Sequence, residues 1–189
     1  MAESDTPFAS PGPEAKLTPS SLNFPVVGIG ASAGGLEALL RFFEQMPAQA
    51  GMAFVAILHL SPSHESSAAE ILQRATRMPV TQVIRDTPIE ADHVYVIPPG
   101  LDLRMNDGQL RPTLRERGKG PHVAIDVFFR TMALVHGERA VCIVMSGTGS
   151  DGAVGLTKVK EQGGVTMAQS PDDAAHDGMP RAAIATGMV

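Results

Sequence analysis

The chain turns from a strand into a helix at residues 26–35, which read Val26-Val27-Gly28-Ile29-Gly30-Ala31-Ser32-Ala33-Gly34-Gly35. The first half of this stretch is apolar and β-branched, which predicts a buried strand. Apolar residues at helical spacing follow it, and glycine lets the backbone turn sharply or approach a neighbouring element closely. Ser32 lies in the turn among small residues that leave its hydroxyl unshielded. A serine in this position is either a phosphate ligand or a nucleophile, and the rest of the chain has to distinguish these roles.

The alternation of strand and helix recurs along the chain. Apolar runs predict buried strands at residues 52–59, 80–84, 141–145 and 165–169, with helical periodicity between and after them. Residues 93–114 instead alternate apolar and polar side chains on either side of an Asn-Asp-Gly turn, which predicts an antiparallel hairpin. We therefore expect an α/β fold: a doubly wound, mainly parallel sheet with helices on both faces and an antiparallel hairpin excursion at the edge.

The composition predicts one folded domain behind a tail. The chain has 189 residues, of which 43% are hydrophobic and 4% aromatic, so a single aliphatic core is expected. Residues 1–23 mix Ser, Thr, Pro, Glu and Ala without periodicity, which predicts a flexible N-terminal tail. Residues 24–189 then form the folded domain.

Charge and cysteine usage exclude several classes of protein. The net charge of −5 disfavours nucleic-acid binding, because a nucleic-acid binder normally carries a basic surface. Cys142 is the only cysteine, so no disulfide forms within the chain and a reducing compartment fits best. No apolar run reaches the roughly 18 residues that a membrane-spanning helix needs. We therefore predict a cytoplasmic protein without membrane insertion.

A nucleotide site is the first alternative for the glycine-rich turn. Gly28-x-Gly30 with Gly34 is a variant of the dinucleotide fingerprint, but the next strand ends in His59 where an acidic ribose ligand is needed. A Walker-type phosphate loop also requires a Gly-Lys-Ser/Thr sequence, which does not follow these glycines. The sequence therefore favours a protein without a cofactor, and a nucleotide-binding domain stays an alternative.

Ser32, His59 and Asp151 each follow a predicted parallel strand, so all three are expected at one edge of the sheet. A serine hydroxyl becomes a nucleophile when a histidine takes its proton, and a carboxylate fixes the tautomer of that histidine. Each residue also has a structural interpretation: a serine in a glycine turn, a histidine at a strand end, and an aspartate that caps the following helix. No cysteine–histidine cluster has zinc spacing, so no metal site is predicted. The remaining histidines are alternative bases or surface residues: His64, His93, His122, His136 and His176.

Four separated motifs identify a family. They are residues 28–35, the strand that ends at His59, the run Ser146-Gly147-Thr148-Gly149-Ser150-Asp151-Gly152, and the run Gly178-Met179-Pro180-Arg181. Together they resemble the catalytic domain of CheB, the chemotaxis protein-glutamate methylesterase, over residues 24–189. The resemblance implies a hydrolase that cleaves glutamate methyl esters on chemoreceptors and deamidates some receptor glutamines. It also implies a nucleophile at Ser32, a general base at His59 and an orienting carboxylate at Asp151.

The resemblance also suggests the surroundings of this triad. The backbone N–H of Thr148, where the family usually has methionine, is expected to bind the oxyanion, with the N–H of Ala33 as a second donor. Three further residues are expected to border the substrate cleft: Met179, His122 and Asp126.

The expected partner is a methylated chemoreceptor, the protein substrate. The Ser-Gly-Thr-Gly variant of the motif also resembles domains fused to a CheR-type methyltransferase, so a covalently fused methyltransferase domain is a further expectation. A tail of 23 residues is too short for a receiver domain, so we expect no gating by phosphorylation in cis. The alternative function is a non-catalytic interaction module of the same fold that docks receptors or signalling partners.

Overall fold

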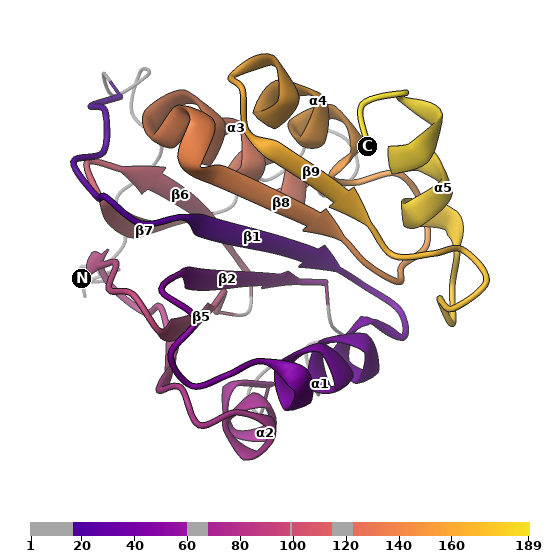
Figure 1. Cartoon of the computed structure of the whole chain (residues 1–189), viewed down its shortest axis with the longest axis horizontal. Coiled ribbons are helices and arrows are strands. Elements are labelled where there is room, and N and C mark those ends of the chain that lie inside the picture. Colours follow the sequence, from indigo (N-terminus) through magenta and orange to yellow (C-terminus); the bar gives the residue numbers. More distant parts are fainter. Residues whose placement is uncertain (1–16, 60–67, 99, 115–122) are drawn as a thin grey trace, which may run out of the picture.

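A six-stranded parallel sheet forms the centre of the molecule, with the strand order β3-β5-β2-β1-β8-β9 (Figure 1). The computed structural model describes residues 17–59, 68–98, 100–114 and 123–189. β1 and β2 lie in the middle of the sheet and every residue in them is buried, as their apolar sequences require. The strands of this sheet are β1 (Val26–Ala31), β2 (Ala53–Leu58), β3 (Val80–Gln82), β5 (His93–Val96), β8 (Ala140–Val144) and β9 (Val165–Ala168).

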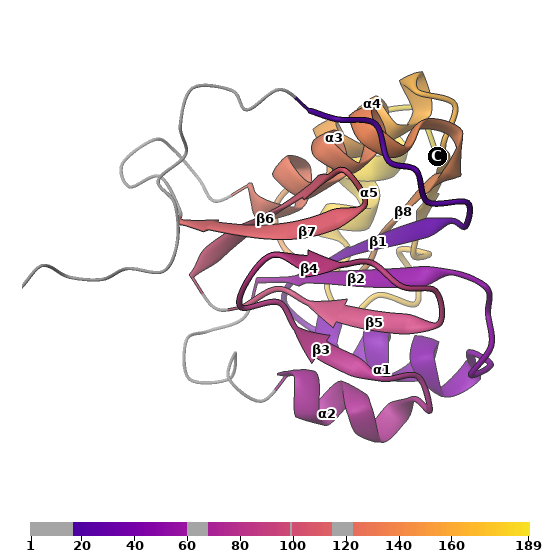
Figure 2. The ribbon, with the colours of Figure 1, turned by 90° about the vertical axis from the view of Figure 1, so that its left-hand side faces the viewer.

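Helices cover both faces of the sheet, which confirms the doubly wound α/β prediction. α1 (Gly35–Gln45) and α2 (Ala68–Ala75) lie on one face, and α3 (Ala124–His136), α4 (Ala153–Glu161) and α5 (Gly178–Ala185) lie on the other (Figures 1 and 2). A short 3-10 turn, Gly137–Arg139, connects α3 to β8. None of the helices in the described part of the chain is long and apolar enough to cross a lipid bilayer.

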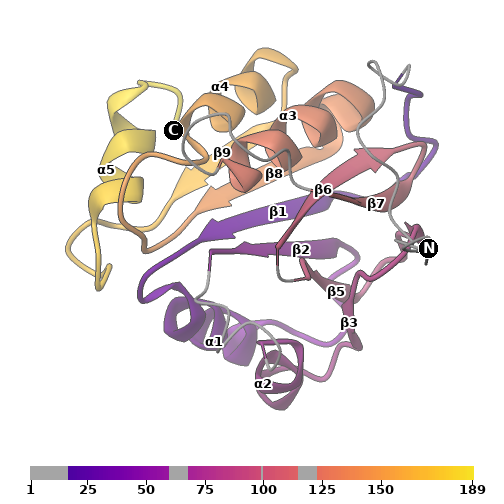
Figure 3. The ribbon, with the colours of Figure 1, turned by 180° about the vertical axis from the view of Figure 1, so that it is seen from behind.

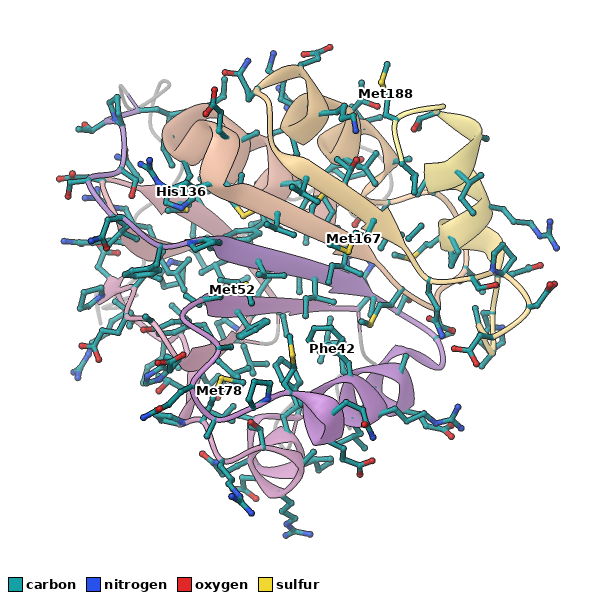
Figure 4. All side chains as sticks on the ribbon, in the orientation of Figure 1. Phe42, Met52, Met78, His136, Met167 and Met188 are labelled. Carbon is teal, nitrogen blue, oxygen red and sulfur yellow. The ribbon has the colours of Figure 1, made fainter. Side chains whose placement is uncertain are left out.

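Two hydrophobic clusters fill the space between the layers. On the side of α1, Phe42, Phe43 and Phe54 pack edge to face, with ring centroids 5.2 to 6.0 Å apart, and Phe42 lies between α1 and β2 (Figure 4). On the side of α3, Phe128 and Phe129 are fully buried against the sheet. The few aromatic residues of the chain are thus concentrated where helices meet strands.

The predicted hairpin forms a sheet of its own. β4 (Thr87–Pro88), β7 (Gln109–Leu114) and β6 (Leu101–Asn106) make a three-stranded antiparallel sheet in that order, which lies beside α3 when the molecule is seen from behind (Figure 3). The N–H of Met105 on β6 donates to the buried Thr131 hydroxyl of α3 at 3.1 Å. The hairpin therefore packs on a helix instead of extending the edge of the parallel sheet, among the residues that the structure describes.

β5 is a parallel strand of the main sheet, between β3 and β2, although its alternating sequence suggested that the antiparallel excursion begins there. The reason is Tyr95, which counts as polar in the sequence pattern but is fully buried. Its hydroxyl donates to the Pro88 carbonyl at 3.1 Å and accepts the Glu90 N–H at 2.9 Å. With the hydroxyl satisfied, the ring behaves as an apolar core residue.

The segment 17–23 packs on the domain, whereas the sequence analysis assigned it to a flexible tail. The N–H of Ser20 donates to the Val135 carbonyl at 2.7 Å, and the N–H of Thr18 donates to the Asn106 side chain at 2.7 Å. Two leucines of the segment contact the main cluster. Most of its contacts use backbone groups, and these leave no hydrophobic period in the sequence. Residues 1–16 of the predicted tail lie outside the described residues.

The glycines of β1 allow α3 to lie close to the sheet. A Cβ atom on Gly30 would lie 2.3 Å from Cγ2 of Ile125, and one on Gly28 would lie 3.0 Å from the rings of Phe128 and Phe129. No side chain larger than hydrogen fits at either position without displacing the helix. In the strand itself, the Gly-x-Gly pattern is therefore explained by packing.

We expect Gly30→Ala to lower the free energy of unfolding by about 1–3 kcal/mol, because the added methyl group forces α3 away from the sheet. Urea denaturation followed by circular dichroism measures this change. The matched test is the double variant Gly30→Ala/Ile125→Ala, in which the clashing side chain is absent. Its loss should be smaller than the sum of the two single losses, and strict additivity would contradict the packing explanation.

Candidate active site

Hydrogen bonds beyond the strand ends hold three loops side by side. The N–H of His59, after β2, donates to the Ala31 carbonyl at 3.0 Å, and the N–H of Ser32, after β1, donates to the Ser146 carbonyl at 2.9 Å. The hydrogen-bond ladders β2–β1 and β1–β8 thus continue past the ends of the strands on both sides of β1. This is the point from which the chain builds the sheet in both directions, where open α/β sheets bind their ligands.

Ser32 occupies the turn between β1 and α1. The turn closes with a 2.8 Å hydrogen bond from the Gly35 N–H to the Ser32 carbonyl, and Gly34 has a φ of 71°, which favours glycine. The Ser32 hydroxyl is partly exposed and lies 3.5 Å from the backbone carbonyl oxygen of His59, to which it donates a long hydrogen bond. The structure therefore brings Ser32 against His59.

His59 and Asp151 face one another. Nε2 of His59 lies 3.2 Å from Oδ2 of Asp151, and the two side chains are 19% and 8% exposed. Asp151 does not cap its own helix: its carboxylate accepts the N–H of Ile125 at 3.1 Å and the N–H of Asp126 at 2.9 Å, at the start of α3. These two bonds fix the carboxylate in the orientation that meets the imidazole.

Burial raises the pKa of Asp151 to about 6. The hydrogen bonds from the backbone of Asp126 and Ile125 oppose this increase in pKa, and the negative charge of Asp126 adds to it. Near neutral pH the carboxylate is therefore ionised, and it can accept a hydrogen bond from His59 when Nε2 carries a proton. Below about pH 6 it is increasingly protonated and loses this capacity.

The predicted oxyanion donors lie beside Ser32 in the sequence or the fold. Ala33 follows Ser32 directly, and Thr148 is exposed in the loop after β8. Within the described ranges, neither the Ala33 nor the Thr148 backbone N–H donates a hydrogen bond to a protein group. Gly147, the residue before Thr148, lies close to the turn between β1 and α1, because a Cβ atom on Gly147 would lie 2.9 Å from Cβ of Ser32.

The three residues expected to border the substrate cleft have different positions. Met179 is fully buried and its sulfur would lie 2.2 Å from a Cβ on Gly147, so it packs against the loop after β8. Asp126 is also buried, and its carboxylate bonds to the start of α4. The contacts of both side chains are therefore with the protein interior. His122 lies outside the described residues.

Ser146 is a residue of this site to which the sequence analysis gave no role. Its buried hydroxyl donates to the Ala33 carbonyl at 2.8 Å and accepts the N–H of His176 at 3.0 Å, while its own N–H donates to the Gln169 side chain at 2.8 Å. One side chain thus connects the turn between β1 and α1 to the segment before α5. Its partners are far apart in the sequence, so no local pattern indicates this role.

The described residues offer no arrangement for a metal ion: no three His, Cys, Asp or Glu side chains within residues 17–59, 68–98, 100–114 and 123–189 are placed to hold one. What the site contains is a hydroxyl, an imidazole and a carboxylate at one edge of the sheet, beside backbone N–H groups. This set of groups can perform acyl transfer through a serine nucleophile.

Comparisons with known proteins assign the chain to a family. The model of the CheB methylesterase family matches residues 27–189. The protein-glutamate methylesterase/protein-glutamine glutaminase of Pyrococcus abyssi is 34% identical over 178 residues, which cover 92% of this chain and 48% of that protein. An uncharacterised 104.1 kDa protein of Rhodobacter capsulatus is 46% identical over 121 residues, which cover 64% of this chain and 13% of that protein.

The same fold is found in the crystal structure of the Thermotoga maritima CheB methylesterase catalytic domain, with a TM-score of 0.80 and 24% identity over 89% of this chain and 91% of that one. This chain spans about half the length of the Pyrococcus relative and a smaller part of the Rhodobacter relative. The match to the family model includes the turn at Ser32, the strand end at His59 and the loop at Asp151. Because it extends over nearly all of the folded residues, the chain belongs to the CheB methylesterase family.

Proposed function

We propose that this chain is the catalytic domain of a protein-glutamate methylesterase that uses Ser32, His59 and Asp151 as a triad. The observation that carries the proposal is the 3.2 Å approach of His59 Nε2 to Asp151 Oδ2, together with the 3.5 Å contact between the Ser32 hydroxyl and the backbone carbonyl oxygen of His59. The name of the Pyrococcus relative, protein-glutamate methylesterase/protein-glutamine glutaminase, supports the choice of substrate class. The proposed substrate is a methylated glutamate side chain on a chemoreceptor.

The orientation of His59 assigns a role to each ring nitrogen. Since Nε2 faces Asp151, the tautomer that suits the pair carries its proton on Nε2, and Nδ1 is the proton acceptor. Nδ1 is the ring nitrogen nearer to the backbone of its own residue. In the proposed mechanism Ser32 gives its proton to Nδ1. In the structure its hydroxyl donates to the backbone carbonyl oxygen of His59 at 3.5 Å, so the hydroxyl has to rotate toward the ring before this transfer.

Hydrolysis then follows two acyl-transfer steps. The Ser32 oxygen attacks the ester carbonyl, His59 takes the serine proton, and the tetrahedral intermediate expels methanol, which leaves with the proton from His59. A water molecule attacks the resulting acyl-serine with His59 again as the base, and this step releases the glutamate carboxylate and restores the serine. Replacing methanol by ammonia describes the deamidation of a glutamine side chain through the same acyl-serine.

The backbone N–H groups of Ala33 and Thr148 are the proposed donors to the oxyanion. Both donors are independent of side-chain identity, so threonine in place of the family's usual methionine leaves the second donor intact. Ala33 also stands just before α1, whose positive end favours negative charge on the substrate oxygen.

The proposed partner is the methylated receptor itself, and a covalently fused methyltransferase domain stays a prediction. The Rhodobacter relative matches this chain over only 13% of its own length, so in that protein the matching region is one part of a much longer chain. A cytoplasmic location likewise stays a prediction.

Methanol release from a chemoreceptor carrying tritiated glutamyl methyl esters tests the proposed function. We expect release that is linear in enzyme concentration and much faster than release from free glutamate methyl ester, since the protein substrate supplies binding energy. A receptor in which the methylated glutamates are replaced by alanine serves as the control. Binding of the methylated receptor without release of methanol would contradict the proposal and favour a non-catalytic interaction module.

The rate should depend on pH through the Asp151–His59 pair. The pKa of Asp151 is raised to about 6, and the carboxylate has to be ionised to hold the imidazole. We therefore expect kcat/KM to be constant above about pH 7 and to fall about tenfold from its plateau at pH 5, with an acid limb that belongs to the coupled pair. Initial rates from pH 4.5 to 8.5 measure this limb. A rate that is independent of pH between 5 and 7 would contradict the assigned role of Asp151.

A further inference from the structure

Asp126 and Asp151 cap each other's helices. Asp151 accepts the N–H groups of Ile125 and Asp126 at the start of α3, at 3.1 and 2.9 Å. In return, Oδ1 of Asp126 accepts the N–H groups of Gly152 and Gly155 at the start of α4, at 3.0 and 2.7 Å. The N-cap positions of the two helices, Val123 and Gly152, make no side-chain cap of their own. Each carboxylate therefore supplies the cap that the other helix lacks.

The starts of the two helices are in close contact. A Cβ atom on Gly155 would lie 2.6 Å from Cβ of Phe129 and 3.0 Å from Cα of Asp126. Gly152 has a φ of 95°, and a Cβ atom there would lie 2.9 Å from Ile125. Close contact through glycine on the side of α4 fixes the separation of the helices, which makes the four hydrogen bonds geometrically coupled.

This arrangement connects Asp126 to the chemistry of the site. The N–H of Gly152 donates to the Asp126 carboxylate, and Gly152 is the residue directly after Asp151. The Asp126 backbone N–H also holds Oδ1 of Asp151, whose other oxygen lies 3.2 Å from His59. Asp126 thus fixes Asp151 at two places, once through the side chain of Asp126 and once through its backbone.

We propose that Asp126 is a positioning residue, whose buried carboxylate holds Asp151 in the orientation that meets His59, and that it does not contact the substrate. The inference rests on the proposed function, because it assigns a task within the same site. It replaces the expectation that Asp126 borders the substrate cleft. The buried Asp126 carboxylate also adds negative charge next to Asp151. The effect of this charge on the pH dependence of the reaction can be measured separately from any effect on folding.

The negative charge of Asp126 affects the pH at which the reaction rate falls on the acid side. The negative charge of Asp126 raises the pKa of Asp151, beyond the larger effect of burial. The other charged or titratable groups near the pair are Arg130, whose charge lowers the pKa of Asp126, and His59, which faces Asp151. Removal of the Asp126 charge alone should therefore displace the acid limb to lower pH.

Two substitutions separate the charge from the hydrogen bonds. Asp126→Asn keeps an Oδ1 that can accept both N–H groups of α4 but removes the charge, whereas Asp126→Ala removes both. The control is Glu161→Gln, which removes an exposed carboxylate from the far end of α4. The readouts are the second-order rate at which a fluorophosphonate probe labels Ser32, from pH 4.5 to 8.5, and the NMR signal of the proton on His59 Nε2.

For Asp126→Asn we expect the fall in labelling rate at low pH to be displaced to lower pH by about half a pH unit. In Asp126→Ala the probe should label Ser32 at least about tenfold more slowly than in the wild type. The His59 signal of this variant should shift or broaden, because Asp151 is no longer held. Glu161→Gln should match the wild type in both readouts.

An unchanged acid limb in Asp126→Asn, together with an unchanged His59 signal in Asp126→Ala, overturns the inference. If Asp126→Ala does not fold, Asp126→Asn alone decides, because its hydrogen bonds are kept. If the wild-type Ser32 is not labelled at all while the His59 signal responds to the two substitutions as expected, the proposed function fails and the positioning role stands.

Discussion

Replacing Ser32 by alanine is expected to reduce methanol release from a methylated receptor by about 10⁴-fold or more. The substitution removes the hydroxyl oxygen that forms the acyl intermediate in the proposed mechanism, while the backbone of the turn is retained. The Ser32 N–H bond to the Ser146 carbonyl does not depend on the side chain, so the fold should be unaffected. Single-turnover measurements with labelled receptor give the residual rate.

Ser170→Ala, which removes an exposed hydroxyl from the segment after β9, is the matched control and should react at the wild-type rate. Binding of the methylated receptor should be similar for the wild type and Ser32→Ala, because the hydroxyl contributes to the chemical step and little to affinity. If Ser32→Ala releases methanol as fast as the wild type, the nucleophile is a different residue and the proposed mechanism is wrong.

Asp151→Asn is expected to have the second largest effect, a loss of about 10² to 10⁴ in kcat. The asparagine side chain has one acceptor and one donor, but three N–H groups converge on this position: those of Ile125, Asp126 and His59. At least one of these donors then meets another donor. The imidazole loses the partner that selects its tautomer and stabilises its charged form.

The pH profile distinguishes this loss from a general loss of structure. The acid limb near pH 6 belongs to the coupled Asp151–His59 pair, so it should be displaced in Asp151→Asn, where only the imidazole still titrates. Asp172→Asn, which neutralises an exposed aspartate, should keep both the wild-type rate and the wild-type limb. An acid limb that persists unchanged in Asp151→Asn would show that another group holds His59.

The middle of the parallel sheet could be predicted because its strands are continuous apolar runs. β1, β2 and β8 are of this kind, and their buried faces leave few alternatives to a central position. Since parallel strands bring their carboxyl ends to one edge, residues 32, 59 and 151 could be expected near one another without any knowledge of side-chain geometry.

Other features depend on contacts that leave no local pattern. Tyr95 is counted as polar until its hydroxyl is seen to be bonded within the core. Asp126 and Met179 looked like residues of a cleft because they stand near the motifs in the sequence, yet both side chains are directed into the protein. Ser146 acts through partners more than twenty residues away, so its role could be found only in three dimensions.

The exchange of caps between α3 and α4 also has a consequence for the order in which the domain folds. Neither helix can complete its first turn while the other is undocked, so the two should form as one cooperative unit instead of in succession. A partly folded chain could then contain the central strands and α1 but would hold no carboxylate opposite residue 59.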